Sequence, residues 1–337
     1  MRPKKLTVLV LLVSFFVLVA IFIKPGNTPT QQDSALRGAL LPVKSLPLDR
    51  TGEDGRTTVT SAENENKERV RHLRRECKHY RKDENGSQYL DYIIVDEKYK
   101  MMFCYIPKIS CSQWKTVFIS LTGSVNSSEL NFGNVHTYHQ SKLNFLRKYS
   151  FRRRQQMLEE YKKYIVVRNP LERLLSAYRN KLAGRGIKDT SFREAGKLIV
   201  KRIRLNATRE SLKKGDDVTF LEFVKFLTDE DTKHLNDHWE LYARLCRPCL
   251  INYDFVGKYE TIKRDADFIL KDIGAPPEVR FPLRSEKYST EKTINTFDNF
   301  YSQIPADYIQ KLYNRYRSDF DIFGYSLSDN LNVTSIP

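Results

Sequence analysis

The chain has 337 residues and carries 57 Lys and Arg against 41 Asp and Glu, which gives a formal net charge of +16. This balance indicates anionic partners, such as a nucleic acid, a polyanionic glycan or a phosphorylated nucleotide. No internal repeat is apparent, which argues against a repeat architecture. The part of the chain beyond residue 76 is long enough to bury a substantial core, as one large domain or as a domain with a lobe.

The N-terminus predicts a membrane anchor. Basic residues at positions 2, 4 and 5 precede an apolar run, residues 6–23, whose length is near the minimum that spans ~30 Å of hydrocarbon. A cleaved signal peptide is the main alternative, but the run exceeds the usual core of about 7–15 residues. The charge distribution favours a cytoplasmic tail (1–5), a signal anchor (6–23) and a lumenal remainder, the type II orientation.

The lumenal part divides into a predicted stem and a predicted domain. Residues 24–76 are rich in Pro, Gly, Thr, Ser, Glu and Asn without sustained periodicity, which predicts a flexible stem. A short helix, charged on all sides, is an alternative around residues 64–75. The folded domain is expected over residues 77–337.

Glycosylation sequons agree with a lumenal location. Four Asn-x-Ser/Thr tripeptides lie beyond the predicted span, at Asn85, Asn126, Asn206 and Asn332. A lumenal domain meets little nucleic acid, so the basic charge indicates a glycan and a nucleotide donor as the anions instead.

A strand, a lysine-bearing loop and a helix start follow one another between residues 101 and 123. The apolar run 101–106 predicts a buried strand, and helical spacing of apolar residues begins at Ser112. The unpaired N–H groups at such a helix start attract an anion, and Lys108 and Lys115 add full charges. The loop lacks the glycines of a Walker A motif, so an ordinary turn with two solvated lysines is the alternative.

The same plan recurs between residues 164 and 181. An apolar strand ends at Arg168, and Pro170 begins an amphipathic helix, where its missing N–H costs nothing. Arg168 can hold a phosphate in its guanidinium fork, and Ser176 lies two helical turns beyond Asn169 with a hydroxyl to donate. These residues predict a second phosphate site.

Together these segments resemble the Golgi carbohydrate sulfotransferases, most closely the branch of chondroitin and dermatan 4-O-sulfotransferases. The resemblance spans roughly residues 77–325, and its motifs are Pro-Lys-x-x-Cys-x-x-Trp-Lys (107–115), Val-Arg-Asn-Pro-x-Glu-Arg-Leu-Leu-Ser-Ala-Tyr-Arg-Asn-Lys (167–181), Lys-Lys-Gly-Asp-Asp (213–217), Asn-Asp-His-Trp (236–239), Cys-Arg-Pro-Cys (246–249) and Tyr-Asp-Phe-Val-Gly-Lys-Tyr-Glu (253–260).

The resemblance implies a donor and its binding residues. The donor is 3′-phosphoadenosine 5′-phosphosulfate (PAPS), with the 5′-phosphosulfate on the first motif and the 3′-phosphate on the second. The implied donor-binding residues are Pro107, Lys108, Ile109, Ser110, Cys111, Ser112, Gln113, Trp114, Lys115, Arg168, Asn169 and Ser176.

Sulfuryl transfer requires a base for the attacking hydroxyl and positive groups around the sulfonate and the leaving phosphate. We assign Lys108 to the leaving oxygen, with Lys115 as support. The resemblance implies His136 as the base, a residue type whose reference pKa suits the lumen. His139 and His238 are rival candidates. No metal is expected, because lysines and helix N–H groups can neutralise the developing charge.

Five cysteines permit two disulfides and one free thiol, and their spacing leaves the connectivity open. A local bridge between Cys246 and Cys249 is the favoured interpretation, since a zinc site needs a second pair of ligands. Cys111 lies inside the first anion loop, where a small side chain is expected to serve packing.

Alternation of strands and helices predicts an α/β fold with a mainly parallel sheet flanked by helices, preceded by a single transmembrane helix, and the resemblance implies that this is the P-loop-like sulfotransferase fold. The donor is expected at the carboxyl ends of the strands. Core burial is the expected role of Trp239, and stacking on a sugar is the alternative.

Two other classes of protein remain as alternatives. A kinase or nucleotide hydrolase requires a Walker A sequence and a metal-binding Asp at a strand end, and neither is found. A non-catalytic, membrane-anchored glycan-binding protein leaves Arg168 and Ser176 without a role. Within the transferases, the segments 213–217 and 237–239 favour position 4 of N-acetylgalactosamine in chondroitin or dermatan, with a uronic acid or an N-glycan sugar as alternatives.

Overall fold

The computed structural model describes residues 55–80, 90–124, 130, 132–184, 189–232, 235–283, 291–327 and 331. The predicted tail, the anchor (6–23) and the first part of the predicted stem lie outside these residues, as do Asn85, Asn126 and Asn332. Among the described helices, none has the length and apolar character needed to cross a membrane.

Within the described residues, five strands form one mixed sheet in the order β3-β1-β2-β4-β5. Their bounds are β1 Ile93–Asp96, β2 Met101–Cys104, β3 Asn144–Phe145, β4 Lys162–Val167 and β5 Phe255–Lys258. The prediction of a mainly parallel sheet is correct only for β2, β4 and β5, because β1 pairs antiparallel with both β2 and β3. A tight turn joins β1 to β2, and such a short connection allows only an antiparallel pair.

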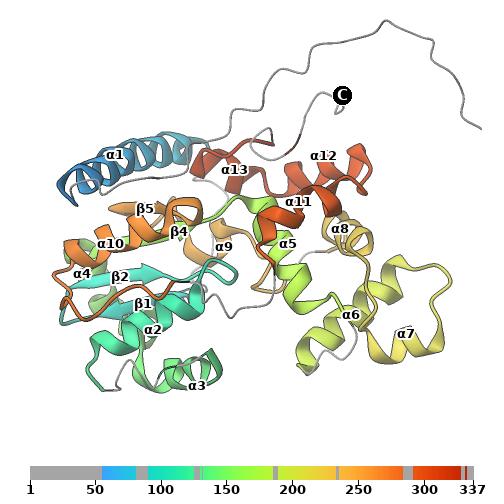
Figure 1. Ribbon diagram of the computed structural model, residues 1–337, viewed down its shortest axis with the longest axis horizontal. Helices are drawn as coiled ribbons and strands as arrows, with labels where there is room; N and C mark the ends of the chain where they lie inside the picture. Colours follow the sequence, from blue (N-terminus) through green and yellow to red (C-terminus); the bar gives the residue numbers. More distant parts are fainter. Residues whose placement is uncertain are drawn as a thin grey trace, which may run out of the picture. The chain divides into compact units, whose positions relative to one another are not determined.

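Helices flank the sheet and extend beyond it as a helical lobe (Figure 1). The helices nearest the sheet are α1 Gly55–Tyr80, α2 Cys111–Leu121, α3 Phe132–Lys142, α4 Phe151–Glu160, α9 Tyr242–Cys246 and α10 Ile262–Asp272. The lobe contains α5 Pro170–Lys181, α6 Thr190–Ile203, α7 Arg209–Lys214, α8 Phe220–Thr228, α11 Thr293–Tyr301, α12 Ala306–Arg315 and α13 Arg317–Phe323.

Each part has its own hydrophobic core. One cluster surrounds the sheet and includes the buried face of α2, and the other joins α5, α6, α8, α11 and α12. The helix α5 starts at the end of β4 and runs into the lobe, so the junction between the two cores lies where both predicted anion loops are found.

The predicted boundary between stem and domain is wrong, because residue 76 falls inside α1. This helix packs Val70 and Leu73 into the core around the sheet. Asn66 accepts the N–H of Val256 (2.8 Å) and donates to the carbonyl of Asp254 (3.0 Å), so its amide covers the free edge of β5 as a neighbouring strand would. The polar composition of the segment hid this apolar stripe.

The disulfides also differ from the favoured local bridge. Cys77 pairs with Cys249, which joins α1 to the segment after α9, and Cys104 pairs with Cys246, which joins the end of β2 to α9. Cys111 is the free thiol. The two cysteines of the Cys-x-x-Cys motif therefore hold two different elements rather than each other.

Candidate functional site

The first predicted anion loop follows β2 and has an unusual backbone. Lys108 (φ 73°) and Ser110 (φ 51°) both adopt the left-handed conformation, which costs a non-glycine residue about 1 kcal/mol each. Alternating backbone handedness of this kind is typical of anion-binding loops, although the N–H of Ile109 is bound by the carbonyl of Ile106 (3.2 Å). Ser110 is also the N-cap of α2 and provides no side-chain cap, so the helix start is open to a ligand.

Lys108 faces an excess of positive charge. Its Nζ donates to Oδ1 of Asn180 on α5 (2.9 Å), and no carboxylate among the described residues forms an ion pair with it. Burial lowers the pKa of Lys108 to about 8, and the charges of Lys181 and Arg168 act in the same direction. A partly desolvated ammonium among cations and without a carboxylate is suited to hold an incoming anion.

The rest of the loop divides into supporting and packing residues. Lys115 is buried with its Nζ 4.4 Å from the centre of the Tyr105 ring, and burial lowers its pKa. Trp114 is almost fully buried against Phe103, with ring centres 4.5 Å apart. Cys111 is half-buried at the first position of α2. Lys115 is therefore a second charge behind the loop rather than at its surface.

The second predicted loop follows β4, as expected. Arg168 is buried and donates through Nε (3.3 Å) and Nη2 (3.1 Å) to one oxygen of Glu172, while its guanidinium lies 4.3 Å from the centre of the Tyr259 ring. Nη1 donates to the carbonyl of Lys108 (3.4 Å). Since a guanidinium has five N–H groups, two remain without a partner among the described residues.

Asn169 and Ser176 have different surroundings. The side-chain oxygen of Asn169 accepts the N–H groups of Leu171 (3.0 Å) and Glu172 (3.4 Å), so the start of α5 is capped, whereas the start of α2 is open. Asn169 is thus a positioning residue in this structure. Ser176 is half-buried on α5, one helical turn before Asn180, which holds Lys108.

Arg173 is a buried anchor that the sequence-based assignment left without a role. Its guanidinium donates to the carbonyls of Pro107 (3.1 Å), Asp237 (2.9 Å) and Glu240 (2.6 Å). It therefore ties the first loop and the Asn-Asp-His-Trp segment to α5. The helical spacing from Asn169 to Arg173 places both on the side of α5 that meets the loop, a signal that was available in the sequence.

The histidines differ in what they contact. His136 lies on α3 with its Nε2 3.0 Å from Oγ of Ser112, in the first turn of α2. Burial, followed by the charges of Lys115 and Lys181, lowers its pKa, which keeps the ring neutral. His238 contacts Asn236 and packs edge-on against the ring of Phe192 on α6. The side chain of His139 is outside the described part.

The remaining predictions concern surface and core. Trp239 is 2% exposed, which confirms a core role over sugar stacking. Asn206 is exposed in the turn between α6 and α7, as glycosylation requires.

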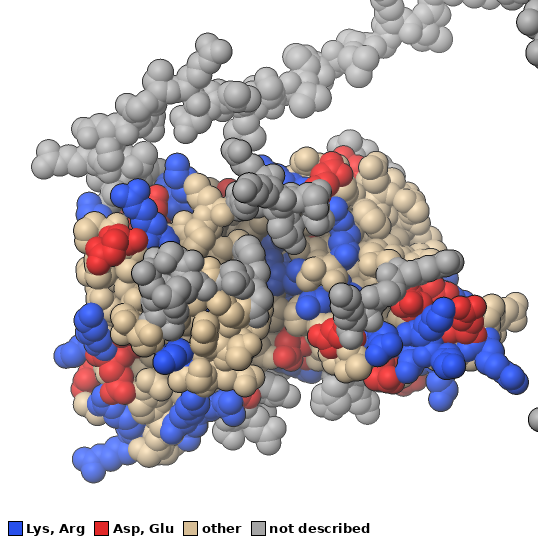
Figure 2. Space-filling view, turned by 60° about the horizontal axis from the view of Figure 1, so that its bottom comes forward, with Lys and Arg blue, Asp and Glu red and all other residues tan. Residues whose placement is uncertain are grey.

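Figure 2 shows Lys and Arg side chains in a recess of the face it presents, and a second group, interspersed with acidic residues, towards the α6–α7 end.

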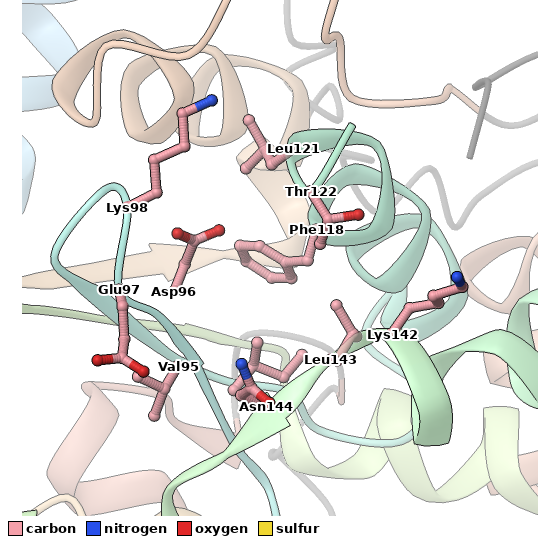
Figure 3. Close-up of a pocket in the computed structure, with 11 residues that line it drawn as sticks. Val95, Asp96, Glu97, Lys98, Phe118, Leu121, Thr122, Lys142, Leu143 and Asn144 are labelled. Atoms are coloured by element: carbon pink, nitrogen blue, oxygen red, sulfur yellow. The ribbon is translucent and has the colours of Figure 1, made fainter. Parts of the chain in front are cut away.

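A pocket of about 230 Å³ lies at the other end of α2. Phe118, Leu121 and Thr122 from the last turns of that helix line it together with the turn after β1 (Figure 3). It is next to the amino end of β2, whereas Lys108 follows the carboxyl end. Open α/β sheets bind ligands at the carboxyl ends of their parallel strands, so this pocket is separate from the candidate site.

Comparison with known proteins identifies relatives across most of the chain. A family model described as "Sulfotransferase family" matches residues 91–326. Carbohydrate sulfotransferase 11 of Rattus norvegicus is 38% identical over 251 residues, covering 72% of this chain and 70% of the relative. Carbohydrate sulfotransferase 14 of Homo sapiens is 39% identical over 245 residues (73% and 62%), and carbohydrate sulfotransferase 9 of Homo sapiens is 35% identical over 245 residues (69% and 53%). No solved structure matches the chain significantly.

Proposed function

The chain belongs to the sulfotransferase family as a PAPS-dependent carbohydrate sulfotransferase, and from this premise we propose that it sulfates position 4 of N-acetylgalactosamine in chondroitin or dermatan. The similarity to carbohydrate sulfotransferases 11 and 14 supports the glycan acceptor, and the motifs at 213–217 and 237–239 favour the 4-O position. Another glycan hydroxyl, on a uronic acid or an N-glycan sugar, is the second candidate.

The observation that carries the donor assignment is the loop after β2. Its left-handed backbone, the uncapped start of α2 and the ammonium of Lys108 lie together, and no carboxylate among the described residues forms an ion pair with that ammonium. This donor set fits a phosphosulfate, and the residues assigned to it are 107–115. PAPS supplies the sulfuryl group when it is bound.

The second loop is assigned to the 3′-phosphate. Arg168 has two N–H groups available beyond those given to Glu172 and Lys108, and Ser176 has a hydroxyl on the same helix. Asn169 supports them by capping α5. The parallel register of β2 and β4 places both loops at one edge of the sheet, which is the arrangement that a ligand with two phosphate groups needs.

The proposed reaction is an in-line displacement at sulfur. His136 takes the proton of the acceptor hydroxyl at Nε2 as that oxygen attacks, and its lowered pKa favours the neutral ring, the form that can accept a proton. The hydroxyl of Ser112 lies 3.0 Å from Nε2 of His136 and so occupies the position that the acceptor hydroxyl would take. Lys108 stabilises the charge on the oxygen that leaves with the phosphate, with Lys115 adding its field from behind the loop.

We further propose a Golgi location for the enzyme. The type II anchor predicted at residues 6–23 and the four predicted glycosylation sequons, of which Asn206 is exposed, support a lumenal domain. Polyanionic glycans are assembled in that compartment, and the net charge of the chain suits them.

The test is transfer of labelled sulfate from PAPS to desulfated chondroitin, dermatan and heparan, followed by disaccharide analysis. Label at position 4 of N-acetylgalactosamine is expected, and dominant label on uronic acid would overturn that acceptor assignment. His136→Ala is expected to remove turnover and leave the affinity for adenosine 3′,5′-bisphosphate nearly unchanged. Normal turnover of this variant rejects His136 as the base. A protein that neither transfers sulfate nor binds the bisphosphate would instead be a glycan-binding protein.

A further inference from the structure

Two polar side chains next to Lys108 share one aromatic residue. Lys181, at the end of α5, has its Nζ 4.3 Å from the centre of the Phe192 ring on α6. The imidazole of His238 meets the same ring edge-on, with the two centres 4.9 Å apart at 89°. The charges of Lys181 and Lys108 both act on His238. These groups therefore lie together on the lobe side of the donor loop.

The tautomer of His238 is set by Asn236. Oδ1 of Asn236 accepts the backbone N–H of His238 (3.0 Å) and lies 2.9 Å from its Nδ1. An oxygen that already accepts one N–H offers the ring nitrogen only an acceptor, so Nδ1 carries the proton. Burial, with the charges of Lys181 and Lys108, lowers the pKa of His238 to about 3. Nε2 is left with a lone pair and has no partner among the described residues.

Lys181 is a half-buried ammonium that no carboxylate among the described residues pairs with. Burial lowers its pKa, and the charge of Asp189 opposes that effect. One oxygen of the Asp189 carboxylate, Oδ1, accepts from N (3.0 Å) and Oγ (2.6 Å) of Ser191 at the start of α6, and Asp189 forms no ion pair with Lys181 within the described residues. The site thus offers an ammonium without an ion pair next to an imidazole nitrogen without a hydrogen-bond donor, both within the described residues.

We propose that Lys181 and His238 form the subsite for the acceptor sugar, in which Lys181 pairs with the carboxylate of a uronic acid and Nε2 of His238 accepts a hydrogen bond from a sugar hydroxyl. This inference rests on the proposed glycan sulfation. Uronic acid and hexosamine alternate along glycosaminoglycans, so one chain carries both groups on neighbouring sugars. An N-glycan sugar without a carboxylate gives Lys181 no partner.

The subsite adjoins the donor site but is formed by different residues. Asn180 binds Lys108, and the next residue, Lys181, contacts Phe192 in the lobe. Two consecutive residues at the end of α5 thus belong to the two sites. Arg173 fixes the segment that carries His238 through the carbonyls of Asp237 and Glu240. Both subsite residues are thus held by the same helix that positions the donor lysine.

The test for Lys181 removes its ammonium from the protein and, separately, the carboxylate from the acceptor. The full-length protein and Lys181→Met are assayed with desulfated chondroitin and with the same polymer after reduction of its carboxyl groups. We expect kcat/KM of the variant to fall about tenfold more with the carboxylate polymer than with the reduced one. Lys201→Met, an exposed position on α6, is the matched control and should show no such difference.

Each outcome decides the point. Equal losses with both polymers, or a matching loss of affinity for adenosine 3′,5′-bisphosphate, would place Lys181 at the donor and overturn the inference. Absence of transfer by the unmutated protein to any glycan would reject the proposed function instead.

His238 is tested by a split between KM and kcat. We expect His238→Ala to raise the acceptor KM about tenfold with both polymers while the donor affinity and the thermal midpoint stay constant. His238→Gln, which restores an acceptor atom, should recover part of the loss. An unchanged KM, or a loss confined to kcat, contradicts a binding role for Nε2.

Discussion

The guanidinium of Arg168 donates a hydrogen bond to the backbone carbonyl of Lys108, 3.4 Å away. The contact joins the loop after β4 to the loop after β2, and Arg173 adds a second bond to the carbonyl of Pro107. Both arginines bind carbonyl oxygens of the first loop and not its N–H groups, of which that of Ile109 donates to the carbonyl of Ile106 (3.2 Å). The two proposed phosphate sites are thus held at a fixed separation before any ligand binds, which lowers the ordering cost of binding.

The affinity for an anionic donor should depend on pH through Lys108. The pKa of its ammonium is lowered to about 8, so the group loses its proton as the pH rises through that value in the free protein. Affinity for adenosine 3′,5′-bisphosphate, measured by calorimetry, is expected to fall by up to about tenfold per pH unit above 8. Lys108→Arg keeps its charge and should show no such decline up to pH 9.5.

The control for this experiment is Lys201→Arg, which changes an exposed lysine of α6. It should retain the decline of the unmutated protein. If Lys108→Arg declines with the same slope, another group is responsible and the assignment of Lys108 fails.

Local patterns predicted the donor loops well. The strand expected to end at Arg168 ends at Val167, and α5 starts at Pro170 as expected. These features depend on neighbouring residues, so apolar spacing and capping chemistry are sufficient to find them.

Long-range pairing was not predictable in the same way. The Cys77–Cys249 bridge closes a separation of 172 residues, and no local signal reports it. Likewise, the three carbonyls that Arg173 binds belong to residues more than 60 positions away. The antiparallel β1 was missed because a strand of four residues has too few positions to show its partner.

Removal of α1 should unfold the domain. Arg69 on this helix binds the buried Asp265 (2.7 Å), and Leu73 is buried in the core around the sheet. A chain that begins at residue 77 leaves Asp265 without this partner and exposes the edge of β5, so we expect an aggregated product without a cooperative thermal transition. A chain that begins at residue 52 should melt cooperatively. Equal melting of both chains would show that α1 is dispensable.

The bridge between Cys104 and Cys246 should stabilise the donor loop and the domain. It closes a separation of 142 residues and fixes α9 to the last residue of β2. Loss of such a bridge by Cys104→Ala with Cys246→Ala is expected to cost about 2–5 kcal/mol in the free energy of unfolding. The matched control is Cys111→Ser, since this cysteine forms no disulfide.

Denaturant titration measures these changes, and peptide mapping without reductant checks the pairing. Recovery of a peptide that links Cys246 directly to Cys249 would contradict the connectivity. A stability loss of similar size in Cys111→Ser would remove the link between the cost and the bridge.

Asp319 should make stability depend on pH. Its carboxylate is almost fully buried in α13 and accepts the N–H of Tyr242 with both oxygens (3.0 Å each) at the start of α9, while the Tyr242 hydroxyl donates to the carbonyl of Arg168 (2.7 Å). Burial raises the pKa of Asp319 to about 7, against the opposing effects of the Tyr242 N–H and Arg173.

The direction of this pH dependence follows from the pH at which Asp319 loses its proton in the folded and in the unfolded chain. An unfolded Asp ionises near pH 3.9, so between about pH 4 and 7 the unfolded chain binds fewer protons than the folded one. Asp319 therefore lowers stability as the pH rises through this range, by up to about 1.4 kcal/mol per unit, and adds no further change above pH 7.

Asp319→Asn removes this dependence, whereas Asp307→Asn, at an exposed position on α12, should keep it. Thermal midpoints at pH 5.0 and 7.5 test the prediction: the unmutated protein should lose several degrees more than Asp319→Asn. Parallel profiles for the two proteins would show that Asp319 does not titrate in this range.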